Sequence, residues 1–369
     1  MRNYILLMLM AAAVSYLCTP MARSLAQRMR VFTPIRARDV HSEPVPRLGG
    51  MAIFLAIGLA LLVASQMSFL RGIFEGSQAI WGILAGAAIV TVVGIADDVW
   101  DLHWMLKLAG QILAAFTVAW LGVRIVVLPI GELMVESIPL QYVVTIFLIV
   151  LTMNAINFVD GLDGLAAGVA VIGGVAFFVT TYWVTRFSFP TDYSNLATLI
   201  MAALIGACVG FLPHNFFPAK IFMGDAGSML IGLLLASSAI AATTQIGGDM
   251  FNRVNGFPAF MPILLPFAVM LLPLLDLVLA VARRTARRRS PFSADRGHLH
   301  HKLIDAGYSH PKAVLMMYLW SAIIAFGVVA FAFFPWQWVL AIDAVVVVAA
   351  VTGTLHPWVG RPEDKQPTA

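Results

Sequence analysis

The sequence predicts an all-α, polytopic integral membrane protein with about eleven transmembrane helices. Of the 369 residues, 60% are hydrophobic and only 11% are charged, whereas a soluble domain carries about 25% charged residues. Mean hydropathy is +0.89, and apolar runs long enough to cross a bilayer as helices recur along nearly the whole chain. A soluble globular fold does not fit this composition.

Eleven apolar runs qualify as membrane spans by their length. They lie near Tyr4–Met21, Gly49–Phe69, Ala79–Ala96, Met105–Leu121, Ile138–Ile156, Leu165–Val184, Leu196–Leu212, Ser228–Thr244, Met261–Ala282, Ala313–Phe334 and Trp336–Leu355. We expect one membrane domain over residues 1–360 and a short polar tail at 361–369. Cys18 and Cys208 both fall inside apolar runs, so we expect them in the core rather than in a disulfide or a metal site.

The charges of the loops predict the orientation of these spans. If the N-terminus lies outside, the inside segments hold 17 of the 23 Lys and Arg residues, as the positive-inside rule requires. We therefore expect an outside N-terminus and an inside C-terminus. The basic run Arg283–Arg289 is then a topology anchor, with binding of anionic lipid or phosphate as the alternative. The net charge of +4 is explained by these loops, and no nucleic-acid partner is expected.

The first polar motif is the pair Asp97-Asp98, which closes the third span. A carboxylate at the middle of a bilayer costs ~2.5–3.5 kcal/mol on insertion scales, so two adjacent ones belong at an interface. A solvated helix end would explain the pair without any function. The functional alternative is a Mg²⁺ site or a general base, because Mg²⁺ commonly takes one or two carboxylates together with substrate phosphates.

The second motif, at residues 154–164, carries a polar residue at every third position. These residues are Asn154, Asn157, Asp160 and Asp163, and each aspartate is followed by a glycine, Gly161 and Gly164. At the start of a helix this spacing would place neighbours on one side, while the glycines allow the backbone to turn and approach a ligand. Asp-Gly pairs also mark ordinary turns. Two such pairs with two upstream amides exceed what a short turn between helices needs, so we favour a functional segment.

The third motif, at residues 222–228, places Asp225 between glycines at the entry to the eighth span. Ser228 is the expected cap of that helix, and the unpaired N–H groups at a helix start suit an anion. Asp225 is a further candidate metal ligand, and Gly224 is a candidate substrate contact.

The fourth motif lies in the long inside loop after the ninth span and contains Arg296, His298, His300 and His301. Zinc binding is disfavoured because no cysteine or suitably spaced partner is near. With Arg296 and Lys302 beside them, the histidines better suit phosphate or sugar hydroxyls.

The fifth motif is the Pro-rich segment at residues 41–50, which contains His41 and Arg47 and runs into the second span. A linker before a helix and a substrate-binding loop are equally good interpretations of it. Outside the five motifs, Lys107 lies at the start of the fourth span, and we expect it to reach the interface by snorkelling.

All five motifs fall on the predicted cytoplasmic side, although the orientation was assigned from Lys and Arg alone. Several carboxylates, glycines that admit phosphates and a basic flank suit the joining of a soluble phosphorylated donor to a membrane-bound phosphate acceptor. A transporter of anionic metabolites is the alternative from another class. It is disfavoured because the carboxylates crowd one face and no inverted repeat is evident.

These motifs, in this order, resemble those of the polyprenyl-phosphate N-acetylhexosamine-1-phosphate transferases, the superfamily of WecA, TagO and MraY. The resemblance covers nearly the whole chain, from Pro-Arg-Leu-Gly-Gly at 46–50 to the histidine motif at 298–301. It implies transfer of a sugar 1-phosphate from a UDP-sugar to a polyprenyl phosphate, with release of UMP. It also implies a Mg²⁺ cofactor, with Mn²⁺ as a substitute, in a bacterial inner-membrane enzyme whose active site faces the cytoplasm.

The resemblance further implies roles for individual residues. Asp97 and Asp98 match the family's aspartate pair, implicated in metal binding and in deprotonating the lipid phosphate, and Asp225 matches its metal-binding aspartate. The segment around Asp160 matches the one associated with nucleotide recognition and catalysis. The expected catalytic residues are thus Asp97, Asp98, Asp160 and Asp163, and the expected metal ligands are Asp98 and Asp225. The expected substrate contacts are His41, Arg47, Asn154, Asn157, Gly161, Gly164, Gly224, Arg296, His298, His300 and His301.

The form of the histidine motif bears on the donor. It reads His-Leu-His-His, similar to the enzymes that use UDP-N-acetylglucosamine, whereas the muramoyl-pentapeptide enzymes carry three consecutive histidines followed by Phe-Glu. The expected partners are therefore UDP-N-acetylglucosamine, a polyprenyl phosphate and membrane lipids, with another UDP-amino sugar or UDP-muramoyl-pentapeptide as alternative donors. Direct attack by the lipid phosphate is preferred over a covalent phosphosugar–aspartate intermediate. The polyprenyl length, the glycan pathway and a homodimer stay open.

Overall fold

The computed structural model describes residues 1–33, 44–126, 137–188, 194–244, 307–331 and 333–355, together with the single residues 278, 282, 285 and 303. Within these ranges the regular elements are helices, and one β-bridge joins Phe32 to Pro46. The helices are α1 (Arg2–Arg28), α2 (Gly49–Gln66), α3 (Arg71–Glu75), α4 (Ala79–Trp100), α5 (Trp104–Trp120), α6 (Ile138–Val159), α7 (Leu165–Ser188), α8 (Leu196–Asn215), α9 (Gly224–Thr244), α13 (His310–Ala330) and α14 (Trp336–Leu355).

Nine of the described helices are long and apolar enough to cross a membrane, and α5 is a shorter apolar helix of 17 residues. The chain is therefore a multi-pass membrane protein, and the predicted all-α class is confirmed. Ten of the eleven predicted spans overlap with these helices. The remaining one, Met261–Ala282, lies almost entirely outside the described residues. The total of eleven spans and the outside N-terminus stay predictions.

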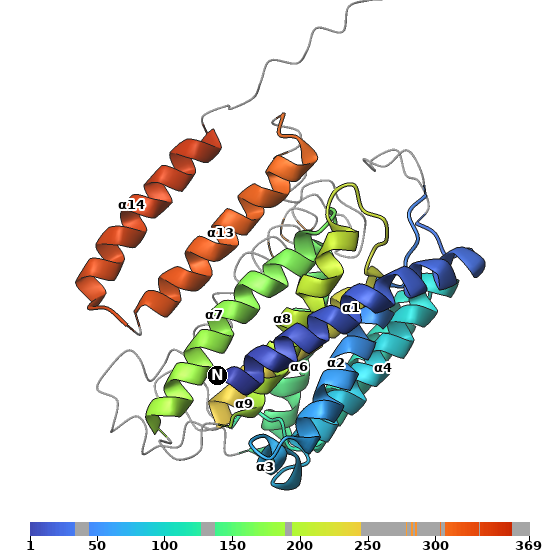
Figure 1. Ribbon diagram of the computed structural model, residues 1–369, viewed down its shortest axis with the longest axis horizontal. Coiled ribbons are helices and arrows are strands. Elements are labelled where there is room, and N and C mark those ends of the chain that lie inside the picture. The colour runs from blue at the N-terminus through green and yellow to red at the C-terminus, as the bar shows by residue number, and fades with distance from the viewer. Residues whose placement is uncertain are drawn as a thin grey trace, which may run out of the picture.

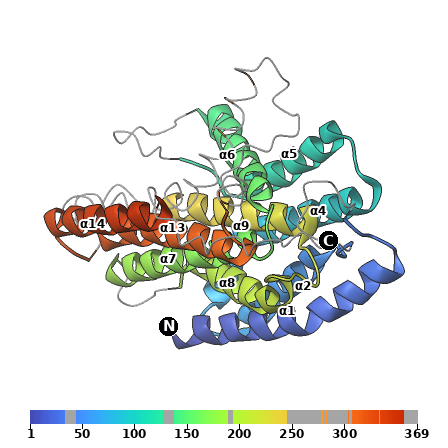
Figure 2. The same ribbon diagram turned by 90° about the horizontal axis from the view of Figure 1, so that it is seen from above.

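Helix α9 lies at the centre of the bundle and packs against α2, α4, α6 and α8. Nearly all of its residues are buried. In Figure 2, α9 runs through the middle, with α1 on one side of the bundle and α5 and α6 on the other. The α13–α14 hairpin lies at the flank, where α13 packs against α7 (Figure 1). A motif at the start of α9 is thus surrounded by several helix ends.

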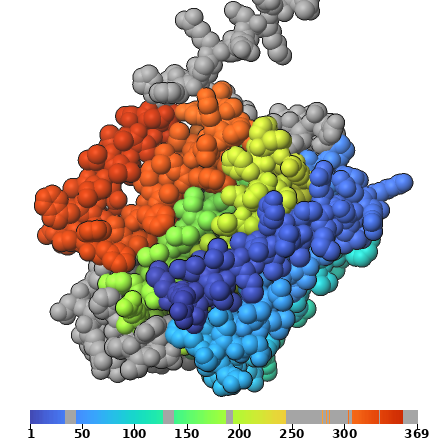
Figure 3. Space-filling view, in the orientation of Figure 1, coloured from blue at the N-terminus to red at the C-terminus, as the bar shows by residue number. Residues whose placement is uncertain are grey.

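Small residues allow α1 and α8 to approach closely. A Cβ atom on Gly206 or Gly210 of α8 would overlap with the backbone of Met8 or Ala12 of α1. Small residues at helix contacts are typical of membrane bundles, where van der Waals packing replaces the hydrophobic driving force. Helix α1 is an integral part of the bundle, and Figure 3 shows it running across one face beside α8 and α2.

The two ends of the bundle differ in chemistry. At one end, Tyr4 packs edge-to-face against Phe69, Phe178 and Tyr182, with ring centroids 5.8 to 6.0 Å apart. At the opposite end α4 and α6 finish, and α2, α5 and α9 begin. We call this the acidic end, because it gathers Asp97, Asp98, Asp160 and Asp225.

Candidate active site

The Asp98 carboxylate joins the end of α4 to the start of α9. Its Oδ1 accepts a hydrogen bond from the Asp225 N–H at 3.1 Å, and its Oδ2 accepts one from the Ala226 N–H at 3.4 Å. The Asp98 side chain is fully buried. A carboxylate at a helix N-terminus is stabilised by the unpaired N–H groups and by the helix dipole. Helix α9 therefore holds Asp98 in one position.

The prediction that Ser228 caps this helix is wrong. Helix α9 begins at Gly224, and Ser228 lies inside it, where its hydroxyl donates to the Gly224 carbonyl at 3.2 Å. Gly224 lies against Asp98: its φ is +68°, and a Cβ there would overlap with the carboxylate. Its contact with substrate stays a prediction. Gly94 of α4 similarly leaves no room for a Cβ beside the Ala226 backbone. The cap of α9 is therefore the Asp98 carboxylate of α4. It can reach the start of α9 because Gly94 and Gly224 allow the two helices to approach closely.

Lys107, the fourth residue of α5, bridges two acidic motifs. Its Nζ lies 3.3 Å from Asp97 Oδ2 and also contacts Asp225 Oδ2. Asp97 Oδ1 accepts the Leu102 N–H at 3.0 Å. All three charged side chains are mostly buried, so each charge needs the others for compensation. The expectation that Lys107 snorkels to the interface missed this position between the two carboxylates.

Two amides of α6 extend the network into the bundle. Asn157 Nδ2 donates to Asp225 Oδ1 and to Ser228 Oγ, both at 2.9 Å. One turn earlier, Asn154 Nδ2 donates to Gln111 Oε1 of α5 at 2.9 Å. Both amides lie near the end of α6, so the three-residue repeat marks the end of a helix and not the expected start. Asn157 orients the Asp225 carboxylate toward Lys107.

Asp163 fixes the turn that follows α6. It is 3% exposed, and its Oδ2 accepts the Ala219 N–H at 2.9 Å. The Asp163 N–H donates to His310 Nε2 at 3.1 Å. Since a nitrogen that accepts this bond carries no proton, the 3.8 Å approach of Asp163 Oδ1 to the same atom is not a charged hydrogen bond. His310, the first residue of α13, is a positioning residue that no local pattern of the chain predicts.

Gly164 completes the same turn with a φ of +77°, which glycine adopts readily. Its N–H donates to Asn215 Oδ1 at 3.1 Å, and its carbonyl accepts the Tyr318 hydroxyl at 2.5 Å. Gly161, by contrast, is exposed. Asp163 and Gly164 thus anchor the turn to α8 and α13, while Gly161 stays accessible.

Asp160, directly after the last residue of α6, differs from the other aspartates of the acidic end. Its side chain is half-buried, and no described residue donates a hydrogen bond to the carboxylate. Burial raises the pKa of Asp160 to about 7; the Arg47 guanidinium opposes this rise, while the Asp98 and Asp163 carboxylates add to it. A carboxylate whose pKa lies near neutrality can exchange a proton at physiological pH.

The segment before α2 brings Arg47 to the acidic end. Arg47 Nη1 lies 3.8 Å from Asp98 Oδ1, and its Nε donates to Thr33 Oγ1 at 2.9 Å. Three backbone hydrogen bonds of 2.8 to 3.0 Å join segment 46–50 to segment 222–223, just before α9. The sequence alone did not separate a linker from a binding loop here, and these contacts place the segment in the site.

The other expected substrate contacts lie outside the described residues: His41, Arg296, His298, His300 and His301. The described part of the site therefore consists of four of the aspartates from three motifs, one arginine, one lysine and the amides of α6. These residues come from segments up to 178 positions apart in the chain, between Arg47 and Asp225.

The clustered oxygen atoms suit a hard divalent cation. Within the described ranges, no group of three or more carboxylate, thiol or imidazole side chains is arranged to hold a metal by itself. Mg²⁺ does not require such a group, since it takes one or two carboxylates and completes its shell with water and substrate phosphates. The Lys107 ammonium between Asp97 and Asp225 shows that positive charge is stabilised at this point. The donor set therefore fits Mg²⁺.

A multi-pass helical bundle that gathers carboxylates, an arginine and a lysine at one end is typical of a membrane enzyme with a polar active site. Residues 80–243, which include the aspartates of the site, match the model of glycosyl transferase family 4.

Comparison with known proteins identifies the family. The chain is 42% identical over 371 residues to the decaprenyl-phosphate N-acetylglucosaminephosphotransferase of Mycolicibacterium smegmatis, covering 99% of this chain and 91% of that protein. It is 29% identical over 326 residues to the undecaprenyl-phosphate alpha-N-acetylglucosaminyl 1-phosphate transferase of Yersinia pestis, covering 86% and 82%. It is 28% identical over 350 residues to the phospho-N-acetylmuramoyl-pentapeptide-transferase of Desulforudis audaxviator, covering 86% and 96%. The chain belongs to the polyprenyl-phosphate N-acetylhexosamine-1-phosphate transferases.

Proposed function

We propose that the protein transfers N-acetylglucosamine 1-phosphate from UDP-N-acetylglucosamine to a polyprenyl phosphate, forming polyprenyl-diphosphate-N-acetylglucosamine and UMP. The convergence of four aspartates with Arg47 and Lys107 at one end of a membrane bundle carries the proposal. The greater identity to the N-acetylglucosamine enzyme of Mycolicibacterium smegmatis than to the muramoyl-pentapeptide enzyme supports the donor. It also agrees with the His-Leu-His-His motif.

The reaction exchanges one phosphorus–oxygen bond for another. An oxygen of the polyprenyl phosphate forms a bond to the sugar-bearing phosphorus of the donor. The bond from that phosphorus to the bridging oxygen breaks, and UMP leaves with this oxygen. Because the attacking group is itself a phosphate, no nucleophile from the protein is needed, and the protein acts through positioning and charge compensation.

The residues of the acidic end divide this work. Asp160, which has no described hydrogen-bond donor, is placed to keep the attacking phosphate ionised. Arg47 offers guanidinium donors to phosphate oxygens, and Asp98 and Asn157 hold Asp225 in position. When bound through Asp225 beside Asp98, Mg²⁺ supplies neutralisation of the diphosphate charge.

The test is a transfer assay with the purified full chain, undecaprenyl phosphate, Mg²⁺ and radiolabelled UDP-N-acetylglucosamine. We expect label in the lipid phase and release of UMP. Both should be abolished by EDTA and by Asp225→Asn. In the wild-type protein, Mn²⁺ in place of Mg²⁺ should support part of the activity. Turnover only with another UDP-sugar would contradict the proposed donor. No turnover with any UDP-sugar, from protein shown to be folded, would contradict the reaction itself.

We also infer that the acidic end faces the cytoplasm of a bacterial inner membrane, because the soluble nucleotide sugar must reach it. Asp101 is exposed and directly follows α4 at the acidic end of the bundle. An Asp101→Cys variant can therefore report on which side of the membrane the acidic end lies. A membrane-impermeant maleimide should label this cysteine in inverted inner-membrane vesicles and leave it unlabelled in intact spheroplasts. The opposite pattern would reverse the orientation.

A further inference from the structure

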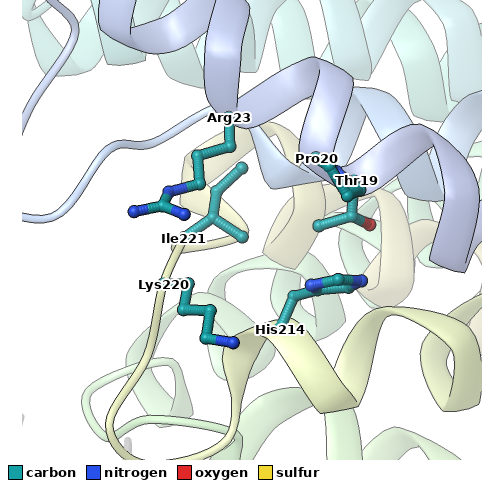
Figure 4. A pocket seen from close by; sticks show the side chains of 6 residues that line it. All are labelled: Thr19, Pro20, Arg23, His214, Lys220 and Ile221. Carbon is teal, nitrogen blue, oxygen red and sulfur yellow. The ribbon is translucent and has the colours of Figure 1, made fainter.

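A second polar site lies at the same end of the bundle, outside the residues assigned to the transfer reaction. A pocket of about 180 Å³ opens between α1, the end of α8 and the segment that leads to α9. Figure 4 shows the six residues that line it: Thr19, Pro20, Arg23, His214, Lys220 and Ile221. Three of these six carry a cationic or titratable basic group, and each of the three comes from a different element.

Pro20 explains how α1 and α8 meet at this pocket. Proline has no N–H, so the Tyr16 carbonyl four residues earlier lacks its donor within the helix. His214 Nε2 lies 3.1 Å from this carbonyl oxygen. Since a carbonyl only accepts, Nε2 carries the proton and donates. This bond, together with the Tyr16 ring 4.8 Å from the His214 ring, fixes the imidazole at the pocket wall.

The two permanent cations of the pocket, Arg23 and Lys220, lack acidic partners among the residues that the structure describes. In Figure 4, Lys220 and His214 lie opposite Thr19 and Pro20, and Arg23 extends from α1. Two uncompensated charges around one small cavity attract an anion with several acceptor oxygens.

The surface beside the pocket is apolar. Leu17 and Met21 of α1 are 67% and 70% exposed, and Val209 of α8 is 45% exposed. On a membrane-spanning helix such side chains face lipid. The pocket therefore lies at the end of a lipid-facing strip, where the phosphate of a lipid and its acyl chains could be accommodated together.

We propose that this pocket binds a phosphate group at the membrane interface. The group belongs either to an anionic phospholipid or to a soluble phosphate. Arg23 and Lys220 contact its oxygens, and His214, held by the Tyr16 carbonyl, forms the wall of the pocket. Lys220 follows Ala219, whose N–H holds the Asp163 carboxylate. A bound phosphate consequently braces the segment between α8 and α9 that leads to Asp225.

The test compares two double variants that remove the same charge. Arg23→Gln/Lys220→Gln removes both cations of the pocket, whereas Arg28→Gln/Lys312→Gln removes two exposed cations that do not line it. Native mass spectrometry of the full chain in detergent measures binding of phosphatidylglycerol and of phosphatidylcholine. We expect about a tenfold weaker affinity for phosphatidylglycerol in the pocket variant and less than about twofold in the control.

A second arm measures thermal stabilisation by inorganic phosphate in lipid-depleted protein. Stabilisation that the pocket variant alone loses, without a difference in phosphatidylglycerol binding, would assign the site to a soluble phosphate. If the pocket variant does not fold, Lys220→Gln, which changes only one exposed residue, should still weaken phosphatidylglycerol binding about threefold. Equal affinities in wild type and all variants, for phosphatidylglycerol and for inorganic phosphate alike, would overturn the proposal.

Discussion

The acidic end and the basic pocket lie at the same end of the bundle but are built in opposite ways. Asp97, Asp98 and Asp225 each receive a hydrogen bond, and Lys107 compensates two of them. In the basic pocket, which is the pocket lined by Arg23, His214 and Lys220, neither Arg23 nor Lys220 forms an ion pair with a carboxylate of the described residues. Carboxylates fixed by neighbouring helices hold one geometry for a reaction. Long cationic side chains around a small cavity can change conformation to bind a ligand reversibly.

The largest effect is expected from the ion network of Lys107. Lys107→Met leaves Asp97 and Asp225 close together without their shared cation, and breaking a buried pair in this way costs about 3–5 kcal/mol. The free energy of unfolding in mixed micelles should fall accordingly. The double variant Lys107→Met/Asp225→Asn should lose less than the sum of the two single variants, and strict additivity would contradict the pairing.

The next effect concerns the contact between α4 and α9. Gly224→Ala places a Cβ against Asp98 at a φ of +68°, so the start of α9 must move. A displacement of about 1 Å can lower a rate by roughly 100-fold, and we expect a loss of this size in kcat/KM. The matched control is Gly58→Ala, because a Cβ there would meet no atom within 4 Å. A wild-type rate for Gly224→Ala would show that the contact is unimportant.

A smaller effect is expected at the turn after α6. His310→Ala removes the acceptor of the buried Asp163 N–H, and an unsatisfied buried group costs about 1–3 kcal/mol. The melting temperature should drop, and His310→Gln, which keeps an acceptor, should recover part of the loss. A melting temperature unchanged in His310→Ala would argue that the turn does not depend on this bond.

The smallest effect is a shift in the pH profile. If ionised Asp160 is required, activity falls as the pH decreases through the raised pKa of this group, about 7. Arg47 lowers that pKa, so Arg47→Gln should raise it and move the acid limb of the kcat profile to higher pH. A limb that stays in place or moves to lower pH would exclude Asp160 as the titrating group.

The positions of the membrane helices were predictable because they depend on local composition. Each apolar run from Tyr4–Met21 to Ser228–Thr244 overlaps with a described helix, since a bilayer selects continuous hydrophobic segments. The ends of the helices were less predictable. Helix α9 begins four residues before the expected Ser228, because the partner of its first N–H groups is Asp98, far away in the chain.

The same limit applies to the site. The aspartate and asparagine motifs were recognisable because carboxylates and amides are rare in membrane spans, and the structure brings Asp97, Asp98, Asn157 and Asp225 together. The pairing of Lys107 with two carboxylates and the role of His310 were not predicted, because both arise only from contacts between distant segments. A single lysine or histidine at the start of a helix carries no local signal for such a pairing.

The most direct test of the central claim compares two neighbouring aspartates in the transfer assay. In Asp98→Asn, an amide replaces the carboxylate that accepts hydrogen bonds from the N–H groups of Asp225 and Ala226. Asp101→Asn is the control, because Asp101 is exposed and lies outside the network. Its φ of +50° is one that asparagine tolerates. If the acidic end carries the reaction, Asp98→Asn should reduce the transfer of labelled N-acetylglucosamine 1-phosphate at least about 100-fold. Asp101→Asn should stay within about threefold of wild type. Equal rates for the two variants, in protein of equal stability, would contradict the assignment of catalysis to this end of the bundle.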